Sequence, residues 1–461
     1  MEVSAPRGHA SPLGASELAS PPQKSRAPAV PADGARAEGA ASVFSSASVT
    51  PPSKQSSAVS FRTLKLEGGP EILIPSRGGD ARSIFHQYLQ ALEQTCDFDW
   101  GKSRYGERYG DEGIAALKKL EPVFVDGPPD LRPAVAVVTS MPGMIIPGEV
   151  AKTYKTVERL EAMGCRPVLI PPIADVLFAD RPALRDRVVG QMVRMFDGVV
   201  GLGGYDIHPH SYGEQHDLST NAREAIDDFE IRFFDKASEA EAFLFGICRT
   251  HQIWNVARGA KMVPDIPSYG LSEFQDQVKY GVSTERMMSM SDPSPEATLD
   301  PTRNFSHAVY LRPGSRMARA AQTETLTTNA VNHQAVDINH PAEGLAVTAV
   351  TVDPMTQQPL VSGTEDWHTL TVQFHPELTE DCAGVNRLFD TLGRRAHLFR
   401  IVKQLRAEGE VPRLERVAEK MRQLQNVKFE ANDFEWLERD LAPRLRPHPV
   451  DWNALSGSGR P

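Results

Sequence analysis

Buried strands alternate with helices through the middle of the chain, and this alternation restricts the fold more than any other feature. Four apolar runs are typical of strands covered on both faces: Ala134–Val138, Pro167–Pro171, Gly198–Leu202 and Ala242–Ile247. Amphipathic stretches between them predict helices over Glu149–Met163, Arg185–Phe196 and Asn221–Ala240. The pattern predicts an α/β fold, a doubly wound and mostly parallel sheet with helices on both faces. Ligands bind such sheets beyond the carboxyl ends of the strands.

After residue 300 the apolar pattern changes to a period of two, which predicts additional strands, some of them antiparallel. These strands are expected at His307–Leu311, Leu345–Val352, Pro359–Gly363 and Thr369–Phe374. The stretch from 385 to 429 has helical spacing. The repeating part of the pattern therefore predicts one large domain over residues 131–397, followed by a helical C-terminal extension over 398–461 that ends in a loose tail.

The chain before residue 131 is of a different kind. Residues 1–60 hold 13 Ala, 13 Ser and 8 Pro with a single aromatic residue, so they bury too little apolar surface to offset the entropy of ordering. We expect a disordered extension there. The sequence pattern over residues 61–130 predicts a small accessory segment. It has a short strand at Glu71–Pro75, a helix over Ala81–Thr95, and a loop between Gly101 and Gly113.

Composition and charge exclude several classes of protein. The net charge of -10 argues against a nucleic-acid partner, and the sequence has no apolar run of the ~18 residues that a membrane span needs. The four cysteines, at 96, 165, 248 and 382, are too widely spaced for a disulfide scaffold or a zinc site and favour a cytoplasmic location. Histidines 208, 210 and 216 have no matching carboxylates, so we expect no metal and no cofactor.

Cys248 is the candidate nucleophile. It lies directly between the strand ending at Ile247 and a helix expected to run to about Arg258. A tight strand-to-helix turn exposes a side chain at the carboxyl edge of the sheet, and the helix N-terminus favours a thiolate. Gly246 allows close backbone approach there. The alternative is that Cys248 is a small buried apolar residue, as many free cysteines are.

His375 and Glu377 are the candidate base and its partner. They follow an apolar strand and are separated only by Pro376. A thiol nucleophile needs a base within hydrogen-bonding reach, and that base needs a group that fixes its tautomer. The alternative is a surface histidine beside an unrelated glutamate.

Four segments in order then carry a resemblance to a known family. They are Gly203–Glu214, Gly246–Val256 with Gly259, Asp265 and Ile266, Val331–Val336, and Gln373–Glu377. Together they resemble the class I glutamine amidotransferase-like superfamily, and within it most closely the γ-glutamyl-γ-aminobutyrate hydrolase (γ-glutamyl hydrolase) branch. The resemblance spans roughly residues 132–392.

The resemblance implies a role for each matching residue. Cys248 would attack a γ-glutamyl amide and form a γ-glutamyl thioester, His375 would transfer the protons, and Glu377 would orient His375. Backbone N–H groups of Gly204 and Arg249 would form the oxyanion hole. Substrate-binding residues implied by the family are Gln252 and, more weakly, Asn332 and His333.

This chain departs from the branch at several positions. Thr250 stands where glycine is usual, and Asn332 stands where a first histidine is common; Ala260 and Pro264 also differ. We expect Thr250 to add bulk near the pocket and Asn332 to change its hydrogen bonding, which leaves the substrate open.

Three functions are compatible with the sequence. They are a stand-alone thiol hydrolase of γ-glutamyl amides, a glutaminase component that delivers ammonia to a separate synthetase, and a catalytically silent binding module. We expect a small-molecule γ-glutamyl substrate and no nucleic-acid or membrane partner. An apolar stripe of four residues after 397 could dock on the main domain or form a homo-oligomer or partner contact: Leu398, Ile401, Val402 and Leu405.

Overall fold

The computed structural model describes residues 59–65, 70–76, 78–96, 122–125, 130–139, 147–214, 222–264, 266, 306–329, 332–353, 356–379, 381–424 and 427. Residues 1–58 of the extension expected over 1–60, the loop expected between 101 and 113, His216, Asp265 and the C-terminal tail lie outside these residues, whereas Ser60 at the end of that extension begins a strand. All the described residues belong to one compact unit, Ser57–Pro461.

Within the described residues a single 14-stranded sheet forms the centre of the unit. Its middle strands are parallel, in the order β2 (Glu71–Ser76), β5 (Arg166–Ile170), β4 (Ala134–Val138), β6 (Gly198–Gly201), β7 (Phe243–Ile247) and β14 (Thr369–Val372). Antiparallel strands continue it on one side through β13 (Pro359–Glu365), β12 (Ala346–Val352), β9 (Ser306–Leu311) and β10 (Thr325–Asn329). This arrangement confirms the predicted mixed α/β fold.

The sheet also takes in segments that the sequence patterns did not predict. On the far side from β10 it is extended by β1 (Ser60–Lys65) and β3 (Val123–Phe124), which pair antiparallel. The two-residue strands β11 (Ala335–Val336) and β8 (Met262–Val263) pair with each other, and β11 pairs with β13. The segment over 61–130 therefore adds strands to the main sheet.

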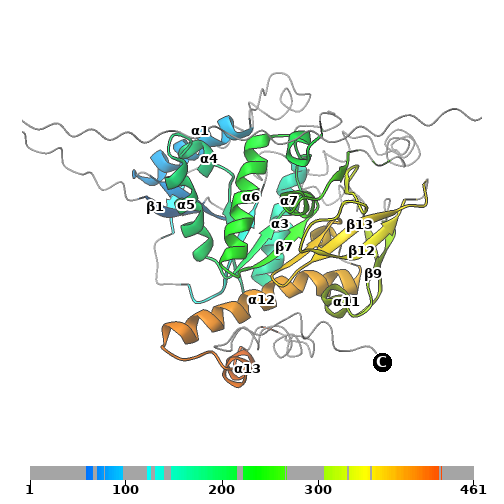
Figure 1. Ribbon diagram of the computed structural model, residues 1–461. Helices are drawn as coiled ribbons and strands as arrows, with labels where there is room; N and C mark the ends of the chain where they lie inside the picture. The colour runs from blue at the N-terminus through cyan, green and yellow to red at the C-terminus, as the bar shows by residue number, and fades with distance from the viewer. Residues whose placement is uncertain are drawn as a thin grey trace, which may run out of the picture. The chain divides into compact units, whose positions relative to one another are not determined.

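The two faces of the sheet are apolar because successive side chains of a strand point in opposite directions. On β4, Val135 and Val137 belong to one buried cluster, and Ala136 and Val138 belong to the other. The first cluster includes side chains of α3 (Pro147–Ala162) and α12 (Ala383–Ala407). The second includes α5 (Pro182–Arg194), α6 (Glu224–Glu239) and α7 (Arg249–Ala257). Figure 1 shows α5, α6 and α7 beside the strands, with α12 running along the lower end.

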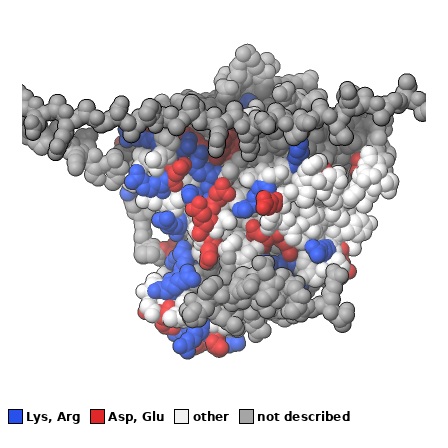
Figure 2. All heavy atoms as spheres, in the orientation of Figure 1, with Lys and Arg blue, Asp and Glu red and all other residues white. Residues whose placement is uncertain are grey.

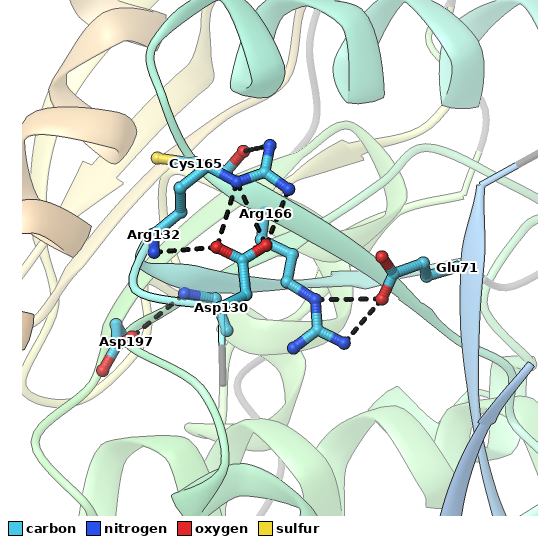
Figure 3. A network of polar contacts seen from close by, with 7 residues as sticks. Glu71, Asp130, Arg132, Cys165, Arg166 and Asp197 are labelled. Carbon is cyan, nitrogen blue, oxygen red and sulfur yellow. Dashed lines mark hydrogen bonds and ion pairs between the residues drawn. The ribbon is translucent and has the colours of Figure 1, made fainter. Parts of the chain in front are cut away.

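The amino ends of the parallel strands meet in a polar network (Figure 3). Asp130 and Arg132 pair at 2.7 Å, and Arg166 on β5 pairs with Glu71 on β2 at 2.6 Å. The fully buried Asp197 accepts the backbone N–H of Ala134 at 3.0 Å. These contacts join β2, β4 and β5 to the turn that precedes β6, at the opposite edge from the strands' carboxyl ends.

The C-terminal helices pack onto this same edge. Lys403 on α12 forms an ion pair with Asp197 at 2.9 Å, and α12 runs unbroken from 383 to 407. Its stripe of Leu398, Ile401, Val402 and Leu405 packs on Val417, Ala418 and Met421 of α13 (Leu414–Arg422). The apolar stripe noted in the sequence is thus covered, at least in part, by a segment of the same chain.

Charged side chains on the face drawn in Figure 2 do not separate by sign; basic and acidic groups lie next to one another. On α13, for example, Arg416 pairs with Glu419 at 2.7 Å, and Lys420 pairs with Glu408 at 3.0 Å. None of the described helices is both long and apolar enough to cross a membrane.

Candidate active site

The backbone places Cys248 on the tight turn that the sequence predicts. Cys248 follows β7 directly and is the N-cap of α7, with φ 48° and ψ -103°. A non-glycine residue in that region stores roughly 1–3 kcal/mol of strain, which the surrounding structure has to hold. The N–H of Cys248 donates to Val372 O of β14 at 2.8 Å, and Cys248 O accepts from Gln252 N at 3.1 Å. The thiol-bearing residue is therefore fixed between two elements.

Thr250 lies behind the turn that carries Cys248. Its side chain is fully buried, and its hydroxyl donates to Leu202 O at 3.0 Å. A Cβ on Gly201 would clash with Thr250 Oγ1, and a Cβ on Gly246 would lie 3.0 Å from Thr250 Cγ2. Thr250 thus fills the space between β6 and β7 behind the turn, and the prediction that it adds bulk near the pocket stays a prediction.

His375 and Glu377 form a buried pair at the end of β14. Glu377 lies in the short 3₁₀ helix η4 (Pro376–Leu378), and its Oε1 is 2.6 Å from His375 Nδ1. Both side chains are almost completely buried, at 1% and 0% exposure. Because a short hydrogen bond from Nδ1–H to a carboxylate fixes the tautomer, Nε2 is the nitrogen available to a reacting group.

Asn329 holds the backbone of His375 in place. Its Oδ1 accepts the N–H of His375 at 2.8 Å, and its Nδ2 donates to His375 O at 2.8 Å. The same amide donates to Thr379 Oγ1 at 2.9 Å. Asn329 is the last residue of β10, far from His375 in sequence, and nothing in its local pattern indicates this role.

The imidazole and the cysteine meet at Gly203. A Cβ on Gly203 would lie 2.5 Å from His375 Cε1, 3.2 Å from His375 Nε2 and 3.3 Å from Cys248 Cβ. The two side chains therefore approach the same point. Among the described residues, Nε2 has no hydrogen-bond partner. Only a residue without a side chain fits at position 203.

Electrostatics at the pair favour a protonated imidazole. Burial lowers the pKa of His375, but the negative charges of Glu377 and Cys248 outweigh burial and raise that pKa from 6.5 to about 9. Lys152 on α3 opposes the rise. A proton held on His375 at neutral pH is available for a leaving group.

A chain of amides reaches the sulfur from Gln373 and Gln252. Gln373 Nε2 donates to Cys248 Sγ at 3.6 Å, and Gln373 Oε1 accepts from Gln252 Nε2 at 3.1 Å. Gln252 Nε2 also donates to Gln334 O at 3.0 Å. Gln252 thus lies close to the thiol, as the sequence suggested, but its amide N–H groups are engaged by the protein and orient Gln373.

The remaining candidates lie around the loop that follows β6. Gly204 follows Gly203 directly in this loop. His333 Nε2 is 2.8 Å from Asp206 Oδ2, which brings the 332–334 segment against the loop. Asn332 instead donates to Gln334 O at 2.9 Å, within its own segment. The structure therefore brings Cys248, His375, Glu377 and the glycine loop together, with His333 bound to Asp206 farther along that loop and Asn332 bound within its own segment.

Three residues at the site escaped the sequence-based predictions. Gly203 carried a signal, because it belongs to a glycine pair after a buried strand. Gln373 belongs to the Gln373–Glu377 motif, but the sequence analysis gave it no function. Nothing in the sequence around Asn329 indicates that it contacts the site. Among the described residues no group of three His, Cys, Asp or Glu side chains is arranged to hold a metal ion.

A family model matches the part of the chain that holds the candidate site, and several known proteins are similar to this chain. The sequence model of the Peptidase C26 family matches residues 133–377 and so ends at Glu377. A protein of Rickettsia prowazekii described as glutamine amidotransferase-like is 27% identical over 252 residues, covering 50% of this chain and 84% of that protein. A Mycobacterium tuberculosis protein described as a glutamine amidotransferase is 28% identical over 194 residues, covering 42% and 54%. A solved structure described as a glutamine amidotransferase from Thermotoga maritima aligns with a TM-score of 0.30 and 13% identity, over 68% of this chain and 98% of that one.

Proposed function

The chain belongs to the Peptidase C26 family, and from that membership and the site geometry we propose that it is a thiol hydrolase of γ-glutamyl amide bonds. The family supports a cysteine-dependent enzyme that acts on amides. The γ-glutamyl preference and the three catalytic roles are our proposal, and they rest on the sequence motifs and on the placement of the side chains.

One observation carries the proposal most directly. Cys248 on its strained turn faces an imidazole whose other nitrogen is bound to a buried carboxylate at 2.6 Å, and both meet at Gly203. A nucleophile, a base and an orienting acid in this relation are the arrangement that covalent acyl transfer requires. A structural cysteine needs no such partners.

The reaction follows from this arrangement. The proton of the Cys248 thiol passes to His375 Nε2, which the raised pKa of the imidazole favours, and the sulfur of the resulting thiolate–imidazolium pair bonds to the γ-carbonyl carbon. The C–N bond then breaks, the amine leaves with the proton from His375, and a γ-glutamyl thioester remains. Water attacks the thioester while His375 takes its proton, which releases glutamate and the thiol. Backbone N–H groups of Gly204 and Arg249 stabilise the oxyanion, each worth about 3 kcal/mol in the transition state.

A second candidate is a glutaminase that passes ammonia to a separate synthetase. The descriptions of the relatives from R. prowazekii and M. tuberculosis favour it. Both candidates use the same thioester, so they differ in the leaving group and in dependence on a partner. Turnover of glutamine that appears only when cell extract is added would favour the glutaminase.

The test compares purified protein on glutamine, γ-glutamyl amines and γ-glutamyl amino acids, with α-glutamyl amides as the negative control. We expect γ-glutamyl turnover that falls by at least about 10³-fold in Cys248→Ser, because the nucleophile is lost with little change in volume. Cys382→Ser is the matched control, since Cys382 is a free and more exposed cysteine. Turnover that survives Cys248→Ser, or that is equal on α-glutamyl amides, contradicts the proposal.

A further inference from the structure

Arg249 follows the nucleophile, and its guanidinium is buried in a way that the reaction above does not explain. The side chain is 1% exposed. Its Nη2 is 2.5 Å from Asp227 Oδ1, and its Nε is 3.1 Å from Glu230 Oε2. Both carboxylates come from α6, one turn apart, and both are equally buried. Burying a charged guanidinium costs free energy even when it is paired, so the stability of the fold does not by itself explain why this side chain is buried here.

The remaining guanidinium nitrogen, Nη1, binds the loop after β6. Nη1 donates to Tyr205 O at 3.0 Å and to Asp206 O at 3.1 Å. Asp227 reaches the same loop farther on, because its Oδ2 accepts from His208 N at 2.9 Å and from Ser211 Oγ at 2.8 Å. The two side chains thus bind four groups of the loop between residues 205 and 211.

That loop begins at the catalytic centre. Gly203 contacts His375 and lies beside Cys248, and Gly204 is the proposed second oxyanion donor. The other proposed donor is the backbone N–H of Arg249 itself. One residue therefore carries one donor on its backbone and fixes the segment that carries the other with its side chain. A displacement of about 1 Å at such a site is enough to cost about 10²-fold in rate.

The carboxylates of Glu230 and Asp227 keep the Arg249 guanidinium charged and hold it in place. Burial raises the pKa of Glu230 to about 7 against the attraction of Arg249, and the neighbouring charge of Asp227 adds to the rise. Burial lowers the pKa of Arg249, but the charges of Glu230 and Asp227 outweigh burial and raise that pKa, so the guanidinium keeps its charge. A planar group with five donors in a fixed fork can hold two carboxylates and two carbonyls at once, whereas a lysine cannot.

We propose that the Arg249 side chain is a positioning residue, which clamps the glycine loop after β6 against the nucleophile so that both oxyanion donors face the same point. Asp227 and Glu230 anchor the clamp on α6. The kinetic consequence rests on the proposed thiol hydrolase function, but the clamp itself is a property of the fold and has its own readout.

The test compares Arg249→Lys with Arg232→Lys. Arg232 lies on α6 and pairs with Asp175 at 2.6 Å and with Asp186 at 3.0 Å, so its substitution also disrupts an ion-paired arginine but leaves the loop alone. Amide hydrogen exchange over residues 203–207 is measured in the folded full-length chains. We expect faster exchange there in Arg249→Lys only. Unchanged exchange in that variant, or an equal rise in both, overturns the clamp whether or not a substrate is known.

The kinetic arm separates positioning from general loss of structure. In Arg249→Lys we expect kcat to fall by at least about 30-fold with KM within about threefold, because an oxyanion hole acts in the transition state. Alkylation of Cys248 by iodoacetamide, which needs no oxyanion hole, is expected to stay within about threefold. A parallel loss of alkylation and turnover contradicts positioning. If Arg249→Lys does not fold, Asp227→Asn tests the same clamp at equal volume; if the wild-type chain turns over no γ-glutamyl amide, the proposed function fails and the exchange result still decides the clamp.

Discussion

Neighbouring groups fix the conformation of the individual residues at the site and limit the space that each can occupy. Cys248 has a backbone conformation that an L residue rarely adopts, and it is held there by hydrogen bonds to β14 and α7. His375 is held by Asn329 through its backbone and by Glu377 through its ring. Gly203 supplies the space in which the sulfur and the imidazole approach each other. The chemistry therefore depends on a residue with no functional group.

Replacing Gly203 by alanine tests this dependence. The new Cβ would lie 2.5 Å from His375 Cε1, closer than carbon atoms pack, so the imidazole must move. We expect kcat to fall by at least about 10²-fold. Gly190→Ala is the control, because its Cβ would meet only a flexible lysine at 3.8 Å and alanine favours a helix by about 1 kcal/mol. Steady-state kinetics and thermal melting distinguish the two; undiminished kcat in Gly203→Ala contradicts the close approach.

The raised pKa of His375 predicts how stability depends on pH. Folding favours the imidazolium, so the stability it contributes is complete below its unfolded pKa of 6.5 and is lost as pH rises through about 9. We expect the difference in melting temperature between wild type and His375→Gln to shrink between about pH 6 and about pH 10. The exposed His340→Gln serves as the control. A difference that grows over this interval would show that His375 is buried as the neutral ring.

At the scale of elements, three adjacent parallel strands assemble the site. β6, β7 and β14 pair side by side in the same direction, so Gly203, Cys248 and His375, each just beyond a carboxyl end, meet at one edge. The sequence predicts this meeting, because buried strands and the residues that follow them are local features. It does not predict Asn329, because the contact of β10 with the end of β14 depends on pairing between distant segments. Gln373 lay in a recognised motif, but its amide contact with Cys248 depends on how α7 packs on β14.

Thr250 shows a second limit of local sequence, which does not specify where a side chain at the start of a helix points. Its place in the chain, two residues after Cys248, suggested bulk near the pocket but did not give the direction of the side chain. The helical turn of α7 directs it between β6 and β7, where Gly201 and Gly246 leave space for its methyl and hydroxyl groups. The direction of one side chain at a helix start is set by the rotation of that helix on the sheet, which local sequence does not specify.

Asp197 anchors elements at the edge away from the site, which separates stability from activity. It accepts a hydrogen bond from the part-buried N–H of Ala134 and pairs with Lys403, which is about one-third exposed, so its removal takes this partner from both groups. We expect Asp197→Ala to lower the unfolding free energy by about 2 kcal/mol with kcat unchanged below the melting transition. Asp130→Ala in the same network removes a more exposed pair and is expected to cost less than about 1 kcal/mol. Equal effects, or a selective loss of kcat, would contradict this division.

At the scale of the whole molecule, the two edges of the one sheet in the described residues carry different features. Polar contacts and the C-terminal helices close the amino edge, and Cys248, His375 and the glycine loop lie at the carboxyl edge. The domain division at 131 and 397 stays a prediction, although β1, β2 and β3 join the main sheet and α12 crosses the second boundary without a break. In the proposed function, the whole arrangement serves a covalent intermediate on the Cys248 sulfur.

Trapping that intermediate is the most direct test. The wild-type chain is mixed with a γ-glutamyl amide that it turns over, quenched in acid before the steady state, digested and analysed by mass spectrometry. We expect the peptide that holds Cys248 to gain the mass of one γ-glutamyl group through a bond that hydroxylamine cleaves, and the Cys248→Ser chain to show no such thioester. Rapid turnover with no adduct on Cys248, or an adduct on Cys382 instead, would contradict thiol catalysis at this site.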